Sequence, residues 1–310
     1  MKKIIILLSF FLCLGSVNAF DLKSKNAILY NLDNNTVLYE LQPDQEIYIA
    51  SLTKIMTSIV AIEQINDLNN KIVIKDVMLD GLIEQDASMA GFEVGDVVSY
   101  KDLLYALLLP SGADAAYSLA YSLVGSEKEF VKLMNDKAQQ LGLKNTHYVN
   151  ITGLDIDNHY STVRDISILL KYALTNETFK KIYTTTYYTT SNGLNLKSSL
   201  QYYFDKFDIE ADYIIGSKTG STDEAGYCLS SIANYNNINY LLITAGADYE
   251  EKLPNHIIDS KQIYEYYFGH YDNINIVNNK QIITTIKTKN SKEKEYNIIA
   301  PKTITYYLNK

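Results

Sequence analysis

Residues 50–57 read Ala-Ser-Leu-Thr-Lys-Ile-Met-Thr, and this stretch is the most informative in the sequence because it places a candidate nucleophile beside a candidate base. The apolar spacing that follows predicts a helix over 51–65, with Ser51 as its N-cap. Ser51 and Lys54 would then lie one turn apart on the same face. A serine hydroxyl is a poor nucleophile until a base takes its proton, and the Lys54 amine can reach it. The predicted buried stripe comprises Ile55, Ile59, Ile62 and Ile65.

A second lysine motif, Lys218-Thr219-Gly220, lies far downstream. A lysine followed by a hydroxyl residue and a glycine suits an electropositive strand that binds a substrate carboxylate, and the glycine would let the substrate approach the backbone. Neither motif is specific alone. An isolated Ser-x-x-Lys recurs by chance and is more often a helix cap followed by a surface lysine.

A third element lies between the two. Ser111-Gly112-Ala113 stands at the joint between two apolar helical stretches. A Ser-x-x-Lys motif, a Ser-x-Asn-type motif and Lys-Thr-Gly form the signature of penicillin-binding proteins and class A β-lactamases. Here the three elements follow in that chain order.

Longer strings around these motifs resemble one family. They are residues 50–57, Gly153-Leu-Asp followed by His159-Tyr-Ser-Thr162, and residues 218–227, which read Lys-Thr-Gly-Ser-Thr-Asp-Glu-Ala-Gly-Tyr. All three are similar to the low-molecular-mass D-alanyl-D-alanine carboxypeptidases, and the resemblance spans about residues 25 to 270. It implies an α+β fold, in which an antiparallel sheet is flanked by helices and stands beside an all-helical lobe.

The resemblance also implies an activity and a set of roles. The expected reaction trims the terminal D-alanine from peptidoglycan stem peptides through an acyl-enzyme on Ser51, with no cofactor and with β-lactams as acylating inhibitors. Lys54 would be the base, its pKa lowered by burial and by the charge of Lys218, and Ser111 would relay a proton to the leaving D-alanine. The expected substrate-binding residues are Lys218, Thr219, Gly220 and Ser221. The backbone N–H groups of Ser51 and Ser221 would form the oxyanion hole.

Two departures from the family pattern keep alternatives open. Ala113 stands where the family's second motif has an asparagine that holds the substrate peptide. Many relatives have an arginine after the last core strand, whereas the only arginine here is Arg164. One alternative is therefore an attenuated or non-catalytic module that binds muropeptides or penicillin. A β-lactamase is disfavoured because no Glu-x-x-Leu-Asn loop lies between the second and third motifs.

The composition argues against two classes of ligand, nucleic acids and metal ions. The 310 residues carry a net charge of −8, which argues against nucleic acid. The four histidines lack metal-ligand spacing, so we expect no metal site. His159 is expected to be structural, and Cys228, in an apolar strand, is expected to be a buried and inert thiol. The oligomeric state is left open.

The sequence pattern at both ends of the chain differs from that of the central residues. Lys2 and Lys3, the apolar run that follows and Val17-Asn-Ala19 predict a signal peptide over 1–19, with export of a mature chain that begins at Phe20. Residues 20–270 are predicted to form the peptidase domain, and residues 271–310 a short β-rich annex. The annex shows no amphipathic helix, so no C-terminal membrane anchor is expected.

The pattern of apolar residues and turn signals predicts the remaining elements. A β-hairpin is expected over 26–32 and 36–41. Helices are expected at 101–109, 113–124, 126–141, 164–174 and 255–268. Core strands are expected at 214–218, 226–233 and 239–245, and annex strands at 274–277, 281–287 and 296–308.

Overall fold

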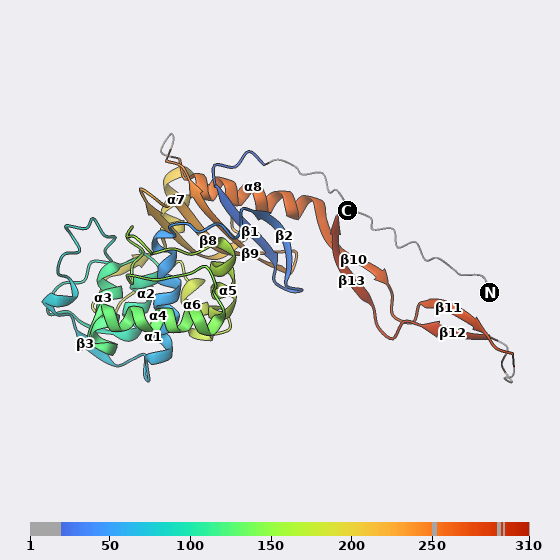
Figure 1. Ribbon diagram of the computed structural model, residues 1–310, viewed down its shortest axis with the longest axis horizontal. Coiled ribbons are helices and arrows are strands. Elements are labelled where there is room, and N and C mark those ends of the chain that lie inside the picture. The colour runs from blue at the N-terminus through green and yellow to red at the C-terminus, as the bar shows by residue number, and fades with distance from the viewer. Residues whose placement is uncertain (1–19, 250–252, 290–292, 294, 310) are drawn as a thin grey trace.

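A five-stranded antiparallel sheet forms the centre of the molecule (Figure 1). The computed structural model describes residues 20–249, 253–289, 293 and 295–309, so the predicted signal peptide lies outside the described residues. The strand order is β2-β1-β9-β8-β7, and every neighbouring pair is antiparallel. The bounds are β1 Asn26–Asn31, β2 Thr36–Leu41, β7 Ile214–Thr222, β8 Gly226–Tyr235 and β9 Ile238–Ala247.

The sheet separates two hydrophobic cores, because successive residues of a strand point to opposite faces. In β1, Ile28 joins the core beneath the helical lobe, whereas Leu29 joins the core beneath α8 (Asn255–His270). Ile243 and Leu242 of β9 divide in the same way. Both faces are covered, so these strands are apolar along their length rather than alternating.

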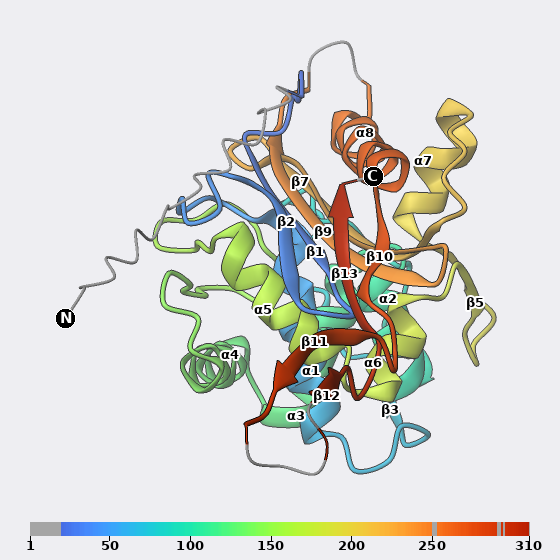
Figure 2. The same ribbon diagram turned by 90° about the vertical axis from the view of Figure 1, so that its right-hand side faces the viewer.

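The helical lobe covers the face of the sheet opposite α8 (Figure 2). It comprises α1 Thr53–Gln64, α2 Tyr100–Leu108, α3 Ala113–Val124, α4 Glu127–Leu141, α5 Val163–Ala173 and α6 Glu177–Tyr183. The predicted helix 113–124 has the observed bounds. α4 ends at Gly142, whose φ of 71° is the left-handed conformation that glycine adopts at low cost. The α+β fold with an all-helical lobe is confirmed.

Helix α1 differs from its prediction in two ways. Ser51 is not its N-cap, because residues Ala50–Leu52 form a 3₁₀ turn and the α-helix begins at Thr53. The helix also has no exposed face along residues 53–61. Its polar side chains are satisfied internally: Thr57 Oγ1 donates to Ile151 O at 2.7 Å. Ile55 and Ile59 of the predicted stripe are buried, and Ile62 and Ile65 are partly buried against the same core. The burial extends around the whole helix, however, so its hydroxyl residues do not face solvent.

Short strands and loops are expected over residues 71–98, and β3 Lys71–Val73 pairs there with β4 Val97–Ser99. Other short elements around the site were not predicted. They are the ribbon of β5 Tyr187–Thr189 and β6 Asn195–Lys197, and helix α7 Ser199–Phe207. Helix α7 is capped by Ser198, whose hydroxyl accepts the Gln201 N–H. Half-buried helices and three-residue strands give weak periodicity in sequence.

The C-terminal residues extend from the end of α8 as an arm of two ribbons (Figure 1). One pairs β10 Tyr271–Val277 with β13 Ile304–Asn309, and the other pairs β11 Ile282–Lys287 with β12 Glu295–Ile299. The strand predicted over 296–308 is therefore two strands, because Pro301 lacks an N–H for the ladder.

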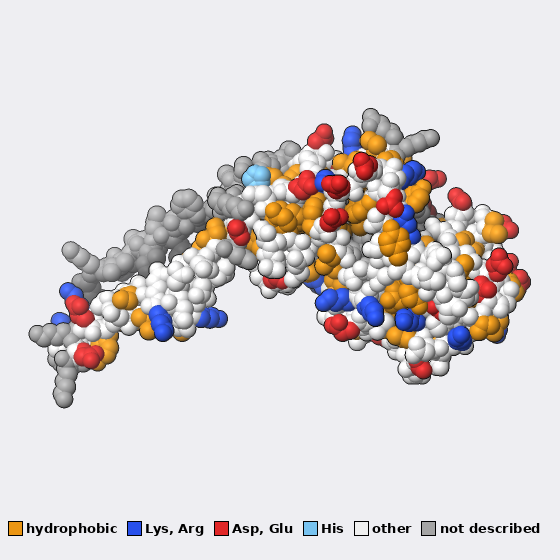
Figure 3. All heavy atoms as spheres, turned by 180° about the vertical axis from the view of Figure 1, so that it is seen from behind, with side chains coloured by type: hydrophobic (Ala, Val, Ile, Leu, Met, Phe, Trp, Pro, Cys, Tyr) orange, Lys and Arg blue, Asp and Glu red, His pale blue; other side chains and the backbone are white. Residues whose placement is uncertain are grey.

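The arm meets the body mainly through one buried side chain, Tyr307, whose hydroxyl lies 2.8 Å from Tyr240 Oη. Hydrophobic and lysine side chains lie exposed along the rest of it (Figure 3). No helix within the described residues is long and apolar enough to span a bilayer.

Candidate active site

Ser51 lies in a tight turn between the sheet and the helical lobe. The preceding residue, Ala50, has a φ of 46°, in the left-handed region. Two glycines make room for this turn. A Cβ on Gly220 of β7 would lie 2.9 Å from Ser51 N, and a Cβ on Gly153 would lie 1.8 Å from Ala50 O. The motif glycine at 220 is therefore required by close packing of β7 on the turn that carries Ser51.

Lys54 is buried directly beneath Ser51. Its Nζ lies 3.0 Å from Ser51 Oγ and donates to Thr152 O at 2.9 Å. Burial lowers the pKa of Lys54 to about 7, and the nearby negative charge of Asp114 opposes that shift. Burial, rather than the charge of Lys218, is thus the main reason that this amine can be neutral near pH 7.

Lys218 forms a second lysine–serine pair. Its Nζ donates to Ser111 Oγ at 2.9 Å and to Thr219 O at 2.6 Å, and its side chain is buried. Burial and the charge of Lys54 hold the pKa of Lys218 well below its ordinary value. An anion that enters beside Lys218 would reverse part of this effect, because it favours the charged amine. Ser111 has a φ of 69° at the joint between α2 and α3.

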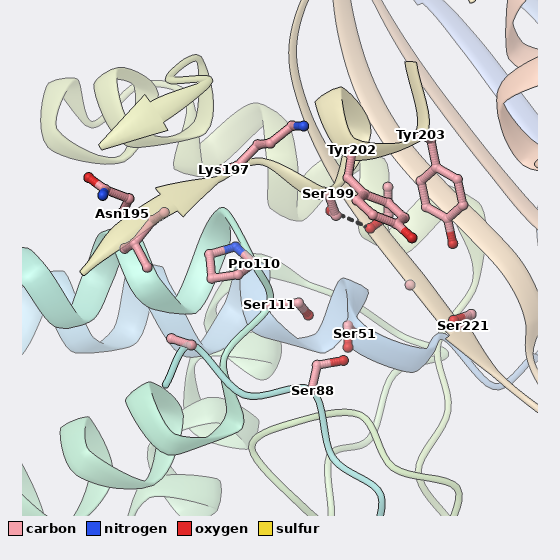
Figure 4. Close-up of a pocket in the computed structure, with 14 residues that line it drawn as sticks. Ser51, Ser88, Pro110, Ser111, Asn195, Lys197, Ser199, Tyr202, Tyr203 and Ser221 are labelled. Carbon is pink, nitrogen blue, oxygen red and sulfur yellow. Dashed lines mark hydrogen bonds between the residues drawn. The ribbon is translucent and has the colours of Figure 1, made fainter. Parts of the chain in front are cut away.

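Two cavities adjoin at Ser51, which lines both of them, and Figure 4 shows the residues that line the first. The first has a volume of about 390 Å³ and is bordered by Ser111, Thr219 and Gly220. The second has a volume of about 680 Å³ and is bordered by Lys54 and Ala113. Among the described residues, those that line both cavities are Ser51, Ser88 and Ser221. A peptide chain that crosses from one cavity to the other therefore passes Ser51.

The structure brings the seven predicted site residues into one cleft. Six of them, Ser51, Ser111, Thr219, Gly220, Ser221 and Lys54, line the cavities. Lys218 lies behind Ser111 and meets its hydroxyl. Ala113 is fully buried and presents only a methyl group to the second cavity. Arg164 binds Glu40 and Asp44 away from the cleft, so it does not replace the family's arginine.

Two neighbouring residues have the structural roles that were predicted for them. His159 Nε2 lies 2.8 Å from Thr53 Oγ1, and its Nδ1 accepts the Val149 N–H. Burial lowers the pKa of His159 to about 4, so the imidazole is neutral near pH 7. Its contact with Thr53 stabilises the start of α1. Cys228 is buried, and burial raises the pKa of its thiol to about 12.

Four residues of the site were not found by sequence reasoning. Thr152 supplies the carbonyl that holds Lys54, and Ser199 Oγ lies 2.5 Å from Thr219 Oγ1. Ser88 lines both cavities, and Asp114 is a buried carboxylate beside Lys54. Asp114 could have been noticed, since it directly follows Ser-Gly-Ala; the others carry no motif.

Comparison with known proteins agrees with this geometry. A family model described as D-alanyl-D-alanine carboxypeptidase, peptidase family S11, matches residues 15–249. D-alanyl-D-alanine carboxypeptidase DacF of Bacillus subtilis (strain 168) is 31% identical over 284 residues, which cover 88% of this chain and 69% of the relative. The D-alanyl-D-alanine carboxypeptidase of Streptomyces sp. (strain K15) is 36% identical over 210 residues, covering 64% of this chain and 72% of the relative.

Solved structures give the same result. The Streptomyces K15 DD-transpeptidase superposes with a TM-score of 0.71 at 31% identity, covering 80% of this chain and 98% of that one. Penicillin binding protein 5 from Haemophilus influenzae superposes with a TM-score of 0.74 at 26% identity, covering 95% and 85%. The two lysine–serine pairs lie in one cleft, and the family model matches most of the chain. The chain therefore belongs to the D-alanyl-D-alanine carboxypeptidase family of serine peptidases.

Proposed function

We propose that Ser51 is the nucleophile with which this serine-type D-alanyl-D-alanine carboxypeptidase forms its acyl-enzyme. The observation that carries the proposal is the 3.0 Å separation of Ser51 Oγ and Lys54 Nζ, where burial lowers the pKa of Lys54 to about 7. A neutral Lys54 accepts the hydroxyl proton as Oγ attacks the carbonyl carbon of the penultimate D-alanine. The ammonium that results is held by Thr152 O.

The negative charge on the carbonyl oxygen is then stabilised by backbone N–H groups, which we assign to Ser51 and Ser221. When the scissile C–N bond breaks, the leaving amine needs a proton, and Ser111 Oγ is placed to relay it because it hydrogen-bonds Lys218. Water hydrolyses the ester on Ser51 and returns the enzyme to its starting state.

The substrate's terminal carboxylate is assigned to Lys218 and the Thr219 hydroxyl. Lys218 is buried, so an incoming carboxylate meets a partner that is poorly screened by solvent. The proposed substrates are therefore stem peptides of peptidoglycan that end in D-alanyl-D-alanine. β-Lactams would acylate the same hydroxyl.

The direct test is release of D-alanine from a synthetic stem pentapeptide. Wild-type protein should release it and Ser51→Ala should not, while both proteins remain folded by circular dichroism. If the wild type releases no more D-alanine than Ser51→Ala, the catalytic proposal fails. The loss of a motif amide at Ala113 would then favour a muropeptide-binding module instead.

The organisation of the whole chain is also proposed. Residues 20–270 form the peptidase unit and residues 271–310 the annex, supported by the change from α8 to isolated ribbons at Tyr271. We also propose export with removal of residues 1–19, supported by the charged and apolar pattern of that segment. N-terminal sequencing of secreted protein should begin at Phe20; protein recovered with Met1 retained would contradict export with cleavage.

A further inference from the structure

A loop between β3 and β4 is fixed against the start of α3, at the edge of the cleft. The carboxylate of Asp114 is fully buried and accepts the backbone N–H groups of Ala90 at 2.9 Å, Gly91 at 2.9 Å and Phe92 at 3.1 Å. Ala113 N–H donates to Ser88 O at 2.7 Å. The first two residues of α3 therefore hold residues 88–92 in place.

This arrangement presents the Ser88 side chain to the cleft. Ser88 lines both cavities together with Ser51 and Ser221, and it is exposed. Figure 4 shows Ser88 next to Ser51, on the loop rather than on β7. A peptide whose scissile bond meets Ser51 must also pass Ser88.

Strand β7 explains why such a peptide needs a partner on this side. It is the edge strand of the sheet, and residues 219–223 border the cavities. A peptide can pair with this edge as an added strand, using the backbone groups along one of its sides. The polar groups along its other side then face the loop and α3, where each loses hydration unless a partner replaces it. Ala113 offers only a methyl group there, whereas Ser88 offers a hydroxyl.

We propose that Ser88 is a further substrate-binding residue, whose hydroxyl hydrogen-bonds the backbone of the acyl-donor peptide on the side opposite β7. The proposal rests on the function proposed above. It also assigns a role to Asp114 as a positioning residue, because the Asp114 contacts keep Ser88 in place before substrate arrives. A group already held in its binding geometry loses little conformational freedom on binding.

The test compares Ser88→Ala, Ser88→Thr and the control Ser122→Ala. Ser122 is also a serine and lies in α3, where its hydroxyl donates to Ser118 O. It does not line either cavity. Loss of one hydrogen bond lowers kcat/KM about three- to tenfold, so Ser88→Ala should show that loss on a D-alanyl-D-alanine pentapeptide. Ser88→Thr keeps the hydroxyl at an exposed position and should stay within twofold of wild type, as should Ser122→Ala.

The same substitutions are then made in Ser51→Ala protein, and calorimetry measures the Kd of the pentapeptide. Ser88→Ala should raise that Kd three- to tenfold. If the wild type releases D-alanine and Ser88→Ala stays within twofold of it in both kcat/KM and Kd, the Ser88 proposal is overturned. The proposed function is unaffected by that result. Equal losses in Ser88→Ala and Ser88→Thr would also overturn it, because they would reflect a disturbed loop. A wild type without D-alanine release overturns the proposed function instead, and the Kd comparison still decides the role of Ser88.

Discussion

At the scale of single residues, the proposed mechanism makes the reaction depend on the protonation state of Lys54. Burial lowers the pKa of Lys54 to about 7, and the neutral amine is the form that we propose acts as the base. The rate constant for acylation by penicillin should therefore rise with pH, with its midpoint near 7, and fall on the order of 100-fold between pH 8 and pH 5. Stopped-flow or gel-based labelling from pH 5 to 9 measures it, with circular dichroism as the control for folding. A rate that is flat from pH 6 to 8 would show that Lys54 is not the base.

Ala113 is a second residue whose chemistry can be changed directly. Asparagine at this position would add a hydrogen-bonding group to the wall of the larger cavity. Such a bond typically contributes about 0.5–1.5 kcal/mol, so Ala113→Asn should raise turnover of a D-alanyl-D-alanine peptide roughly two- to twelvefold. Overpacking could offset part of the gain, because Ala113 is fully buried. Turnover that drops in a variant with an unchanged melting temperature would contradict this expectation.

At this scale the site residues that stand in sequence motifs are predictable, whereas those that only tertiary structure brings to the cleft are not. Ser51 and Lys54 stand three residues apart in a Ser-x-x-Lys motif, and Lys218 opens a Lys-Thr-Gly motif. Both motifs can be recognised in the sequence. Ser88 and Ser199 reach the cleft only because a loop is clamped to α3 and because α7 packs on β7. Their own sequence neighbours carry no sign of this.

At the scale of elements, the turn that carries Ser51 depends on close backbone contact. A Cβ on Gly153 would lie 1.8 Å from Ala50 O, so Gly153→Ala must push the turn, or the Thr152 carbonyl beside it, out of place. We expect at least a tenfold loss in penicillin acylation rate. Gly193→Ala is the matched control. Its φ of 95° is close to the 90° of Gly153, yet nothing lies within 4 Å of its Cβ.

In Gly193→Ala, the alanine in the left-handed region should lower the free energy of unfolding by roughly 1–2 kcal/mol. The acylation rate of this control should not change. Thermal melts and labelling rates of both variants separate the two effects. Equal labelling rates for the two variants would mean that the Gly153 contact does not position Ser51.

Element boundaries were predicted well where turn chemistry is local, and poorly where burial decides. The hairpin of β1 and β2 and the helix α3 follow from turn residues and apolar spacing. Helix α1 does not, because the whole segment is buried and its polar side chains bond inward. The 3₁₀ turn at Ser51 is imposed by contacts with Gly153 and Gly220, which lie far along the chain.

At the scale of the whole molecule, the arm should be dispensable for chemistry. Of the arm residues that the structure describes, none lines the cavities beside Ser51, and the ribbons join the body near Tyr307. A chain that ends at His270 should therefore keep its penicillin acylation rate within twofold. Its melting temperature should drop by a few degrees, because Tyr240 loses its buried partner. Tyr307→Phe in the full chain removes only the hydroxyl contact and serves as the control.

A folded truncated protein that is acylated more than tenfold more slowly would show that the arm contributes to the site. The same result would place the boundary of the peptidase unit beyond residue 270.

In the proposed reaction one hydroxyl, that of Ser51, becomes covalently acylated. Intact-protein mass spectrometry after incubation with penicillin should show one added penicilloyl mass, and peptide mapping should locate it on Ser51. Ser51→Ala should carry no adduct under the same conditions, while Ser88→Ala should still be acylated. An adduct that persists on Ser51→Ala, or that maps to another residue of the wild type, would show that Ser51 is not the nucleophile.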